Sequence, residues 1–187
     1  NIMSEKDKML AGELYDANYN KELIEDWYKA KDICFEYNNL RPSDSEGKDK
    51  IIKKLFAKTG KQIIVEQNFG CDYGYNIFVG ENFYMNHNCI ILDGAKVELG
   101  DNVFIAPNCG FYTAGHPLDY KTRNKGLEYA KPIKVGNNVW IGGNVIVLPG
   151  VTIGDNVVIG AGSILNKDIL SNSVAVGNPC KVIKEIK

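Results

Sequence analysis

The stretch 135-VGNNVWIGGNVIVLPGVTIGDNVVIGAGSIL-165 decides the fold, because aliphatic residues recur in it at every sixth position. The first column comprises Val135, Ile141, Val147, Ile153, Ile159 and Leu165. A second column follows four residues after each of these, at Val139, Val145, Val151, Val157, Ser163 and Ile169. A period of six matches neither an α-helix nor a plain β-strand. It is typical of a β-solenoid, in which short strands alternate with tight turns and stacked coils bury a continuous core.

Glycines of the repeat are predicted at the bends, because glycine adopts backbone conformations that side chains disfavour. They are Gly142, Gly150, Gly154, Gly160 and Gly162. The period also extends backward along the chain, through Phe111, Ile105, Leu99, Ile91, Met85 and Val79, with a two-residue slip that includes Asp93-Gly94. Residues 113–131 are polar and break the register completely. Insertions of this kind form loops outside the solenoid, often on the binding face.

Residues 1–60 are predicted to form a small helical cap. Ser4, with Asp7 three residues later, is typical of a capping box at the start of a short helix. Asn20 is predicted to cap a longer helix, whose apolar face comprises Leu23, Trp27, Ala30, Cys34 and Tyr37. A third helix is expected after the turn at residues 41–43, with an apolar stripe at Ile51, Ile52, Leu55 and Phe56 and with Gly60 as its left-handed stop. These stripes need a partner, either the solenoid or a neighbouring subunit.

Composition excludes several classes of protein. A formal charge of -1, from 22 basic and 23 acidic residues, argues against a nucleic-acid partner. The five cysteines are odd in number and show no CxxC spacing, so neither a disulfide framework nor a zinc site is indicated. The stretch from Asn1 to Asp7 has no apolar leader, and no apolar run is long enough to cross a membrane. We therefore expect a cytoplasmic protein without membrane association.

Several segments outside the bare repeat carry a more specific signature. They are Met9–Ala17 (MLAGELYDA), Cys71–Ile77 (CDYGYNI), Gly115–Asp119 (GHPLD), Glu128–Ile133 (EYAKPI), Asn138–Gly143 (NVWIGG) and Gly177–Cys180 (GNPC). Together these segments resemble the maltose and galactoside O-acetyltransferases, which belong to the left-handed β-helix acyltransferases. The resemblance covers the whole chain, including the helical cap.

This resemblance implies a mainly β fold: a left-handed parallel β-helix over residues 61–187, a protruding loop at 113–131, and a helical cap over 1–60. The left hand comes only from the resemblance, since the general rule for β crossovers predicts a right-handed coil. The resemblance also implies a homotrimer whose active sites lie between adjacent subunits. The implied reaction moves an acetyl group from acetyl-CoA to a hydroxyl of a sugar, of the maltose, glucose or galactoside type, without a metal.

His116 is the best candidate for the chemistry. It lies where the insertion leaves the solenoid, between Gly115 and Pro117, and is one of only two histidines. A neutral imidazole can accept a hydroxyl proton near neutral pH and return it later, as attack of an alcohol on a thioester requires. The alternative is a loop histidine with no task. The resemblance implies that His116 is the general base of a direct transfer without an acyl-enzyme.

Five polar residues are candidates for binding the acceptor. The resemblance implies that Asn86 binds the acceptor hydroxyl beside His116, whereas an Asn at a solvated corner is the alternative. Asp16 and Asp72 resemble acceptor-binding carboxylates, although a helix-terminal charge and a turn residue would also explain them. Asp93 is equally explained by its turn. Glu128 returns with the loop, where it either orients His116 or the sugar or is merely exposed.

The late coils are candidates for binding acetyl-CoA. Glycines such as Gly143 leave the backbone open to a pantetheine arm, and the resemblance puts the Gly143 amide near the thioester carbonyl. Lysines lie where the resemblance implies phosphate-binding cations, although any one of them could be simply solvated. Trp140 is a candidate wall of the acetyl site, or else a packing residue. The full donor set is Trp140, Gly143, Ala161, Asn166, Lys167, Lys181 and Lys184.

Other functions remain open at this point. A γ-class carbonic anhydrase shares the left-handed solenoid but needs three histidine ligands, and this chain offers only His87 and His116. A non-catalytic solenoid would need neither a histidine-bearing loop nor open glycines. Among acyltransferases, a xenobiotic or serine O-acetyltransferase is the alternative, against which the cap with Leu14-Tyr15-Asp16 argues. The sequence does not rank the possible acceptors.

Overall fold

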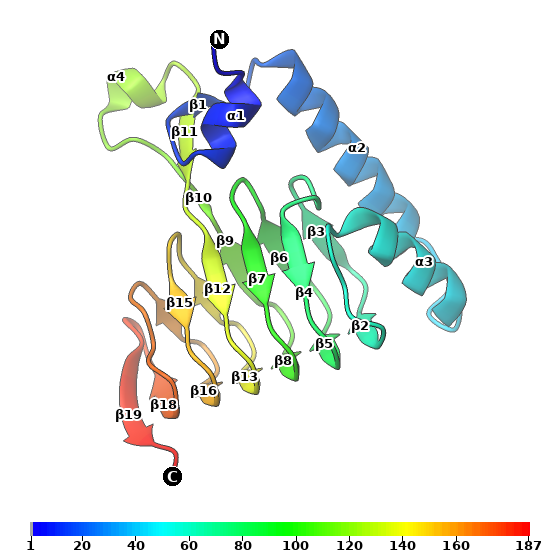
Figure 1. Cartoon of the computed structure of the whole chain (residues 1–187), viewed down its shortest axis with the longest axis vertical. Helices are drawn as coiled ribbons and strands as arrows, with labels where there is room; N and C mark the ends of the chain where they lie inside the picture. The colour runs from blue at the N-terminus through cyan, green and yellow to red at the C-terminus, as the bar shows by residue number, and fades with distance from the viewer. Residues whose placement is uncertain (1) are drawn as a thin grey trace.

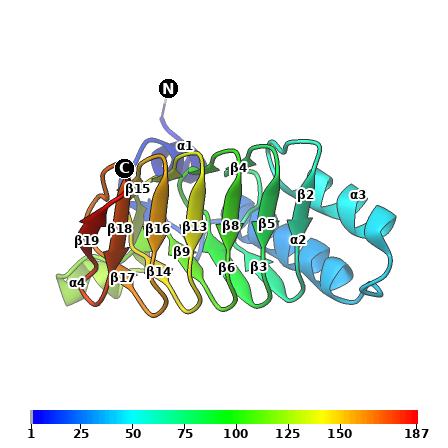
Figure 2. The same ribbon diagram turned by 90° about the horizontal axis from the view of Figure 1, so that it is seen from below.

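The computed structural model describes residues 2–187. Asn1, the first residue of the stretch in which no apolar leader was found, lies outside the described residues. It is a mainly β solenoid with helices at its N-terminal end (Figure 1). Figure 2 shows the strands of successive coils side by side, from β2 to the C-terminal β19. The predicted solenoid with N-terminal helices is therefore confirmed.

Three parallel sheets form the faces of the solenoid, and each strand pairs with strands one coil away. The seven-stranded face comprises β2 (Ile63–Val65), β5 (Phe83–Met85), β8 (Val103–Ile105), β13 (Val139–Ile141), β16 (Val157–Ile159), β18 (Ser173–Val176) and the antiparallel β19 (Lys181–Glu185). The five-stranded face comprises β3 (Phe69–Cys71), β6 (Cys89–Leu92), β9 (Gly110–Tyr112), β14 (Ile146–Val147) and β17 (Ile164–Leu165). The four-stranded face comprises β4 (Ile77–Val79), β7 (Val97–Leu99), β12 (Ile133–Val135) and β15 (Thr152–Ile153).

The chain visits these faces in a fixed order, which defines three corners. The first corner joins the seven-stranded face to the five-stranded face. The second joins the five-stranded face to the four-stranded face, and the third leads on to the next coil. Residues of one corner therefore stack above one another along the solenoid, although they lie about 20 positions apart in sequence in the early coils, as in the pairing of Phe69 with Cys89.

The core consists of the side chains that the six-residue period predicted. Both columns point inward and are buried, as are the earlier positions from Val79 to Phe111. Ser163 is the polar member of the second column, and its hydroxyl donates to the Gly160 carbonyl and accepts from the Gly177 amide. Because the buried hydroxyl both donates and accepts a hydrogen bond, it avoids the free-energy cost of burying an unpaired polar group. The predicted core is confirmed.

Asparagine, more often than glycine, forms the tight bends. Eight asparagines among residues 2–187 have φ between 52° and 62°, whereas of the predicted glycines only Gly150 and Gly162 have positive φ. Asparagine tolerates this left-handed region because its short polar side chain can hydrogen-bond locally. Gly142 has a different role: a Cβ there would lie 2.7 Å from the Ala161 nitrogen of the next coil. The five glycines therefore lie at bends as predicted, but only Gly150 and Gly162 use the left-handed conformation there.

Side chains at the third corner link successive coils. Asp101 accepts from the Glu81 amide at 2.7 Å, Asn137 from the Asp101 amide at 2.8 Å, and Asp155 from the Asn137 amide at 2.7 Å. Each bond joins the backbone of one coil to a side chain of the next. This ladder satisfies backbone donors that leave the sheets at the bends.

Three helices precede the solenoid: α1 (Glu5–Leu10), α2 (Lys21–Asn38) and α3 (Ser45–Leu55). Ser4 and Asp7 form the predicted capping box, and Asn20 caps α2 as predicted. The stop of α3 was predicted wrongly: the helix ends at Leu55, with Phe56 as its C-cap. Gly60 lies against the next coil, where a Cβ would meet the Gly80 oxygen at 2.5 Å. The apolar faces of α2 and α3 join the solenoid core, except at two residues of α2. Leu23 is buried in a separate cluster with Met9 and Tyr15, and Trp27 stays partly exposed. Residues 1–60 as a separate unit remain a prediction.

The insertion at residues 113–131 has its own structure. It contains β10 (Ala114–Gly115), α4 (Tyr120–Arg123) and β11 (Leu127–Ala130). With β1 (Tyr15–Asp16) these strands form a small antiparallel sheet in the order β1-β11-β10. The sheet joins the insertion to the N-terminal segment at the second corner, where Figure 1 shows them side by side. No helix formed by residues 2–187 is both long and apolar enough to cross a bilayer.

Candidate active site

A cavity of about 490 Å³ lies at the second corner, between α2 on one side and the insertion on the other. The N-terminal segment, α2, two turns of the early coils and the insertion line it. They contribute Tyr15, Ala17 and Asn18; Ile24, Trp27 and Tyr28; Asp72, Tyr73 and Leu92; and Ala114, His116 and Glu128. Its size falls within the range of small-molecule sites, ~300–1,000 Å³. Three of the predicted site residues, His116, Asp72 and Glu128, therefore share one pocket.

His116 follows β10 directly, and its side chain is exposed to the pocket. Arg123 of α4 donates to the carbonyls of Pro117 and Leu118, both at 3.2 Å, and so holds the chain just after the histidine. Asp119 caps α4 through the Thr122 amide at 2.8 Å. The imidazole is thus carried on a short segment that is hydrogen-bonded on its C-terminal side.

Glu128 lies on β11, directly across from Tyr15 of β1. Burial raises the pKa of the Glu128 carboxyl, and the positive charge of a protonated His116 opposes this shift. The two groups are therefore close enough to interact electrostatically. A carboxylate in this position can stabilise the imidazolium that forms when His116 takes a proton.

Asp72 lies in the turn after β3 and borders the pocket from below. Its Oδ1 accepts from Trp27 Nε1 at 3.2 Å and lies 3.7 Å from the ammonium of Lys31. Burial raises the pKa of Asp72, while the charge of Lys31 opposes that shift. The carboxylate is held by two side chains of α2, and it can accept a hydrogen bond from a bound hydroxyl.

Asp93 lies beneath the pocket and does not line it. Its side chain is fully buried, at 0% exposure. Its Oδ1 accepts from the amides of Asp72 and Tyr73 at 3.0 and 2.8 Å, and its Oδ2 from the Asn76 amide at 3.3 Å. Burial raises its pKa to about 6, which these backbone hydrogen bonds partly oppose. Asp93 thus organises the turn that carries Asp72, as its turn position suggested, and it does not line the pocket of a single chain. Its contact with the acceptor stays a prediction.

Asp16 is also occupied by local structure. Its Oδ1 accepts from the amides of Asn18 and Tyr19 at 3.1 and 2.9 Å, a turn that presents Asn18 to the pocket. Asp16 neighbours Tyr15 on β1, and successive residues of a strand point to opposite faces. Its side chain does not line the pocket in a single chain.

The aromatic wall of the pocket was missed by sequence reasoning. Trp27 was assigned to the buried face of α2, and neither Tyr28 nor Tyr73 was singled out. Trp27 and Tyr28 are adjacent in sequence, so a helical periodicity puts them on different faces. The sequence does contain one indication of this wall. Trp27 and Tyr28 form an aromatic pair at the edge of the apolar stripe of α2, where the helix surface changes from buried to exposed.

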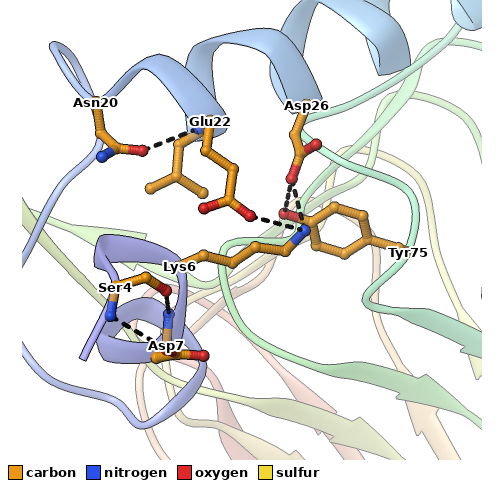
Figure 3. Close-up of polar contacts among 8 residues, drawn as sticks. Ser4, Lys6, Asp7, Asn20, Glu22, Asp26 and Tyr75 are labelled. Atoms are coloured by element: carbon orange, nitrogen blue, oxygen red, sulfur yellow. Dashed lines mark hydrogen bonds and ion pairs between the residues drawn. The ribbon is translucent and has the colours of Figure 1, made fainter. Parts of the chain in front are cut away.

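A polar network ties α1 and α2 to the turn behind this wall (Figure 3). Lys6 of α1 donates to Asp26 Oδ2 of α2 at 2.8 Å, and the Tyr75 hydroxyl donates to the same oxygen at 3.0 Å. The Tyr75 ring stacks on Tyr73, with centroids 5.3 Å apart and an interplanar angle of 11°. Because Tyr73 lines the pocket and Asp26 precedes Trp27, this network fixes the relative position of both.

Asn86 lies away from His116, at the first corner, where its Oδ1 accepts from the His87 amide at 2.7 Å. The four residues of β6 separate the first corner from the second, about 13 Å at ~3.3 Å per residue. The predicted donor residues Gly143 and Ala161 also lie at the first corner, in later coils. A single chain therefore does not bring Asn86 and His116 together.

The remaining donor residues are spread over the C-terminal coils. Trp140 projects outward from β13. Asn166 and Lys167 follow β17 at the second corner, whereas Lys181 and Lys184 lie on β19 of the seven-stranded face. All four of these polar side chains are exposed. One chain alone does not gather the predicted donor residues into one pocket.

Comparison with known proteins gives a consistent result. Residues 8–60 match the maltose acetyltransferase hexapeptide capping motif, and residues 132–167 match the bacterial transferase hexapeptide of six repeats. A putative acetyltransferase of Saccharomyces cerevisiae is 54% identical over 180 residues, which cover 96% of this chain and 92% of that protein. The chain belongs to the maltose O-acetyltransferase family. It is therefore an acyltransferase, of the maltose O-acetyltransferase type.

Solved structures of the family have the same fold. A maltose O-acetyltransferase from Clostridium difficile 630 is 56% identical, with a TM-score of 0.98 and complete coverage of both chains. A galactoside acetyltransferase in complex with coenzyme A is 45% identical, with a TM-score of 0.95, covering 100% of this chain and 92% of that one. A hexapeptide-repeat acetyltransferase from Vibrio cholerae, complexed with acetyl-coenzyme A, is 36% identical, with a TM-score of 0.91 and coverage of 99% and 100%. The solenoid is thus the left-handed β-helix of these acyltransferases.

Proposed function

We propose that this chain is an acetyl-CoA-dependent sugar O-acetyltransferase in which His116 is the general base. The observation that carries the proposal is the pocket in which the His116 imidazole faces hydrogen-bond acceptors, the carboxylates of Asp72 and Glu128. Carboxylates accept short, strong hydrogen bonds and so orient the hydroxyl groups of a sugar. The complexes of two family members with coenzyme A or acetyl-coenzyme A support the choice of donor.

The proposed reaction is a direct transfer. The acceptor hydroxyl attacks the thioester carbonyl carbon while an imidazole nitrogen of His116 takes the hydroxyl proton. The tetrahedral intermediate then expels the coenzyme A thiolate, which receives the proton back from the imidazolium. The products are the acetyl ester and the free thiol. Glu128 stabilises the imidazolium through its charge, because the two groups interact in the pocket.

The open backbone of the first corner supports donor binding. Within residues 2–187, the amides of Gly143 and Ala161 donate to no backbone carbonyl, so they remain available to a ligand. A pantetheine arm carries amides that pair with such groups, and a free amide can also stabilise an oxyanion. Lys167, Lys181 and Lys184 are exposed cations for the phosphates, with Asn166 next to Lys167 in sequence and Trp140 assigned to the acetyl group.

The outward side chains of the faces support a homotrimer. On the seven-stranded face one register column reads Ile64, Tyr84, Phe104, Trp140, Val158 and Val174. On the five-stranded face the equivalent column reads Gly70, Ile90, Gly110, Ile146 and Ile164. On the four-stranded face it reads Phe78, Glu98, Lys134 and Thr152. The seven- and five-stranded faces are thus apolar and the four-stranded face is largely polar. This pattern suits a cyclic assembly in which the apolar faces pack against neighbouring copies.

The site itself also needs a second copy. Asn86 and Gly143 lie at a different corner from His116, and a neighbouring copy brings the first corner of one chain to the second corner of the next. Leu118, beside His116, is an apolar side chain that is 96% exposed. We assign it to the contact between copies, where its burial would stabilise the assembly. The Asn86 amide then binds the acceptor hydroxyl beside the neighbour's imidazole.

Replacement of His116 tests the proposal. His116→Ala should lower turnover by about two to four orders of magnitude, the usual contribution of a positioned base. The Kd for acetyl-CoA should stay the same, because the donor groups lie on other coils. His87→Ala is the control, because it removes the chain's only other imidazole. Release of the coenzyme A thiol, measured across a panel of sugars, gives the turnover of each variant. Near-normal turnover by a trimeric His116→Ala protein would exclude His116 as the base.

A further inference from the structure

One wall of the pocket has no part in the chemistry proposed above. Trp27 and Tyr28 of α2 line the cavity together with His116 of the insertion. Figure 1 shows α2 and the insertion as separate segments at the same end of the molecule. Their rings meet edge to face, with centroids 5.2 Å apart and an interplanar angle of 82°. They are 38% and 59% exposed. Two aromatic rings at right angles therefore leave an open apolar corner inside a pocket that also contains the carboxylates of Asp72 and Glu128.

This aromatic corner is fixed in place before any ligand binds. Trp27 Nε1 donates to Asp72, and the Lys31 ammonium lies 4.6 Å from the centroid of the indole ring. Lys31 in turn donates to the Cys71 carbonyl at 2.6 Å. The lysine thus covers one face of the indole, and the remainder of the ring is exposed to the pocket. A rigid, preformed surface loses little entropy when a ligand is placed on it.

The charge of the pocket restricts what can bind there. Asp72 and Glu128 border it, whereas no lysine or arginine of residues 2–187 is part of its lining. A phosphorylated or carboxylated acceptor would face like charges in a partly buried site, which is unfavourable. An uncharged acceptor with polar edges and an apolar face suits these walls.

We propose that Trp27 and Tyr28 determine acceptor specificity, by binding the second ring of a glycoside whose first ring lies beside His116. This inference rests on the proposed sugar O-acetyltransferase function. The C–H bonds of a ring carry slight positive charge and are attracted to the negative face of an aromatic side chain. The cavity is also larger than one sugar ring. Its volume of about 490 Å³ corresponds to about sixteen water molecules of ~30 Å³ each, whereas a hexose has only about twelve non-hydrogen atoms.

Binding energy from a ring that does not react still raises the efficiency of transfer, because it helps to hold the reacting hydroxyl in position. The measured quantity is therefore a selectivity ratio. It is kcat/KM for the phenyl glycoside divided by kcat/KM for the methyl glycoside of a hexose that the native enzyme acetylates. The two acceptors share the reacting ring and differ only in the second ring.

Tyr28→Ala is the test variant, because Tyr28 is exposed and its loss leaves the Trp27–Asp72 hydrogen bond in place. The ratio should fall about three- to tenfold, the range expected for one lost aromatic contact. Tyr28→Phe should keep the native ratio, since it keeps the ring. Phe35→Ala is the matched control, an aromatic of the same helix that is 73% exposed and outside the pocket, and it should change nothing.

The outcomes separate this inference from the function on which it rests. An unchanged ratio in Tyr28→Ala, or an equal loss of kcat/KM for both acceptors, would overturn the second-ring subsite. The sugar acetyltransferase function would stand in either case. A native enzyme that binds acetyl-CoA but acetylates no glycoside would instead overturn the function itself, and the subsite with it.

Discussion

The interior of the solenoid and the pocket at its second corner are built on opposite principles. In the interior, each residue contacts its equivalent one coil away, as Val139, Val157 and Val103 do in adjacent strands. In the pocket, His116 and Trp27 come from segments about 90 positions apart, and neither has an equivalent in another coil. The repeat supplies stability through many similar contacts, whereas the site depends on a few unique ones.

This difference has an energetic consequence. A side chain lost from the interior leaves a cavity that neighbouring coils cannot fill, so stability should suffer most there. A side chain lost from the pocket borders open space, so activity should change more than stability.

Ile141→Ala tests the interior. Ile141 is fully buried on β13, and its truncation should lower the free energy of unfolding by about 2–5 kcal/mol. Leu170→Ala is the control, an exposed aliphatic residue whose loss should cost less than about 0.5 kcal/mol. Urea denaturation at a fixed protein concentration measures both. Equal effects of the two substitutions would mean that the repeat does not act as a packed core.

Asp93→Asn tests the base of the pocket. Burial raises the pKa of Asp93 from 3.8 to about 6 in the folded protein, so the folded state binds more protons than the unfolded state between these values. The stabilising contribution of the protonated carboxyl is fully present below about pH 4 and is lost as the pH rises through about 6. At 1.36 kcal/mol per pKa unit, the change amounts to about 3 kcal/mol.

The asparagine variant cannot ionise, so it should lack this pH dependence. The difference in unfolding free energy between the two proteins should therefore shift by about 3 kcal/mol in favour of the variant between pH 3 and pH 7. Denaturation curves at several pH values give this difference. A difference that stays constant across this range would show that Asp93 titrates like an exposed carboxyl.

Tyr75→Phe tests the network behind the aromatic wall. It removes only the hydroxyl that donates to Asp26, while Lys6 still pairs with that carboxylate. We expect a loss of about 1 kcal/mol in unfolding free energy, typical of one hydrogen bond. The KM for the acceptor should rise slightly and that for acetyl-CoA should not, because α2 carries only acceptor-side groups. Tyr19→Phe, which changes an exposed hydroxyl, is the control. Equal effects of both variants would contradict a positioning role for Tyr75.

The sequence predicted the regular parts of the molecule well, because their signals are local or strictly periodic. The six-residue columns, the Ser4 capping box and the Asn20 cap all follow from short-range rules that the structure confirms. His116 was singled out because it lies where the period breaks, and it does line a pocket with Asp72 and Glu128. Its role as a base stays a prediction.

The sequence predicts least where contacts between residues distant in sequence determine the role of a side chain. Gly60 was predicted as a helix stop, but the neighbouring coil is what requires a residue without a side chain there. Asp93 resembles any turn residue in sequence, and only the stacking of coils buries it beneath Asp72. Trp27 belongs to an apolar stripe, yet its ring lines the pocket, donates to Asp72 and stays 38% exposed. None of these outcomes has a signal within a few residues of the position concerned.

In the proposed enzyme each catalytic site is shared, with His116 from one copy and Asn86 from the next. Mixed trimers of two variants test it most directly. His116→Ala and Asn86→Ala should each be nearly inactive alone. Co-expressed in equal amounts, they should recover about a quarter of native activity, because in a closed ring about one site in four then combines two intact residues. Mixed trimers no more active than either parent would show that both residues act within one chain or not at all.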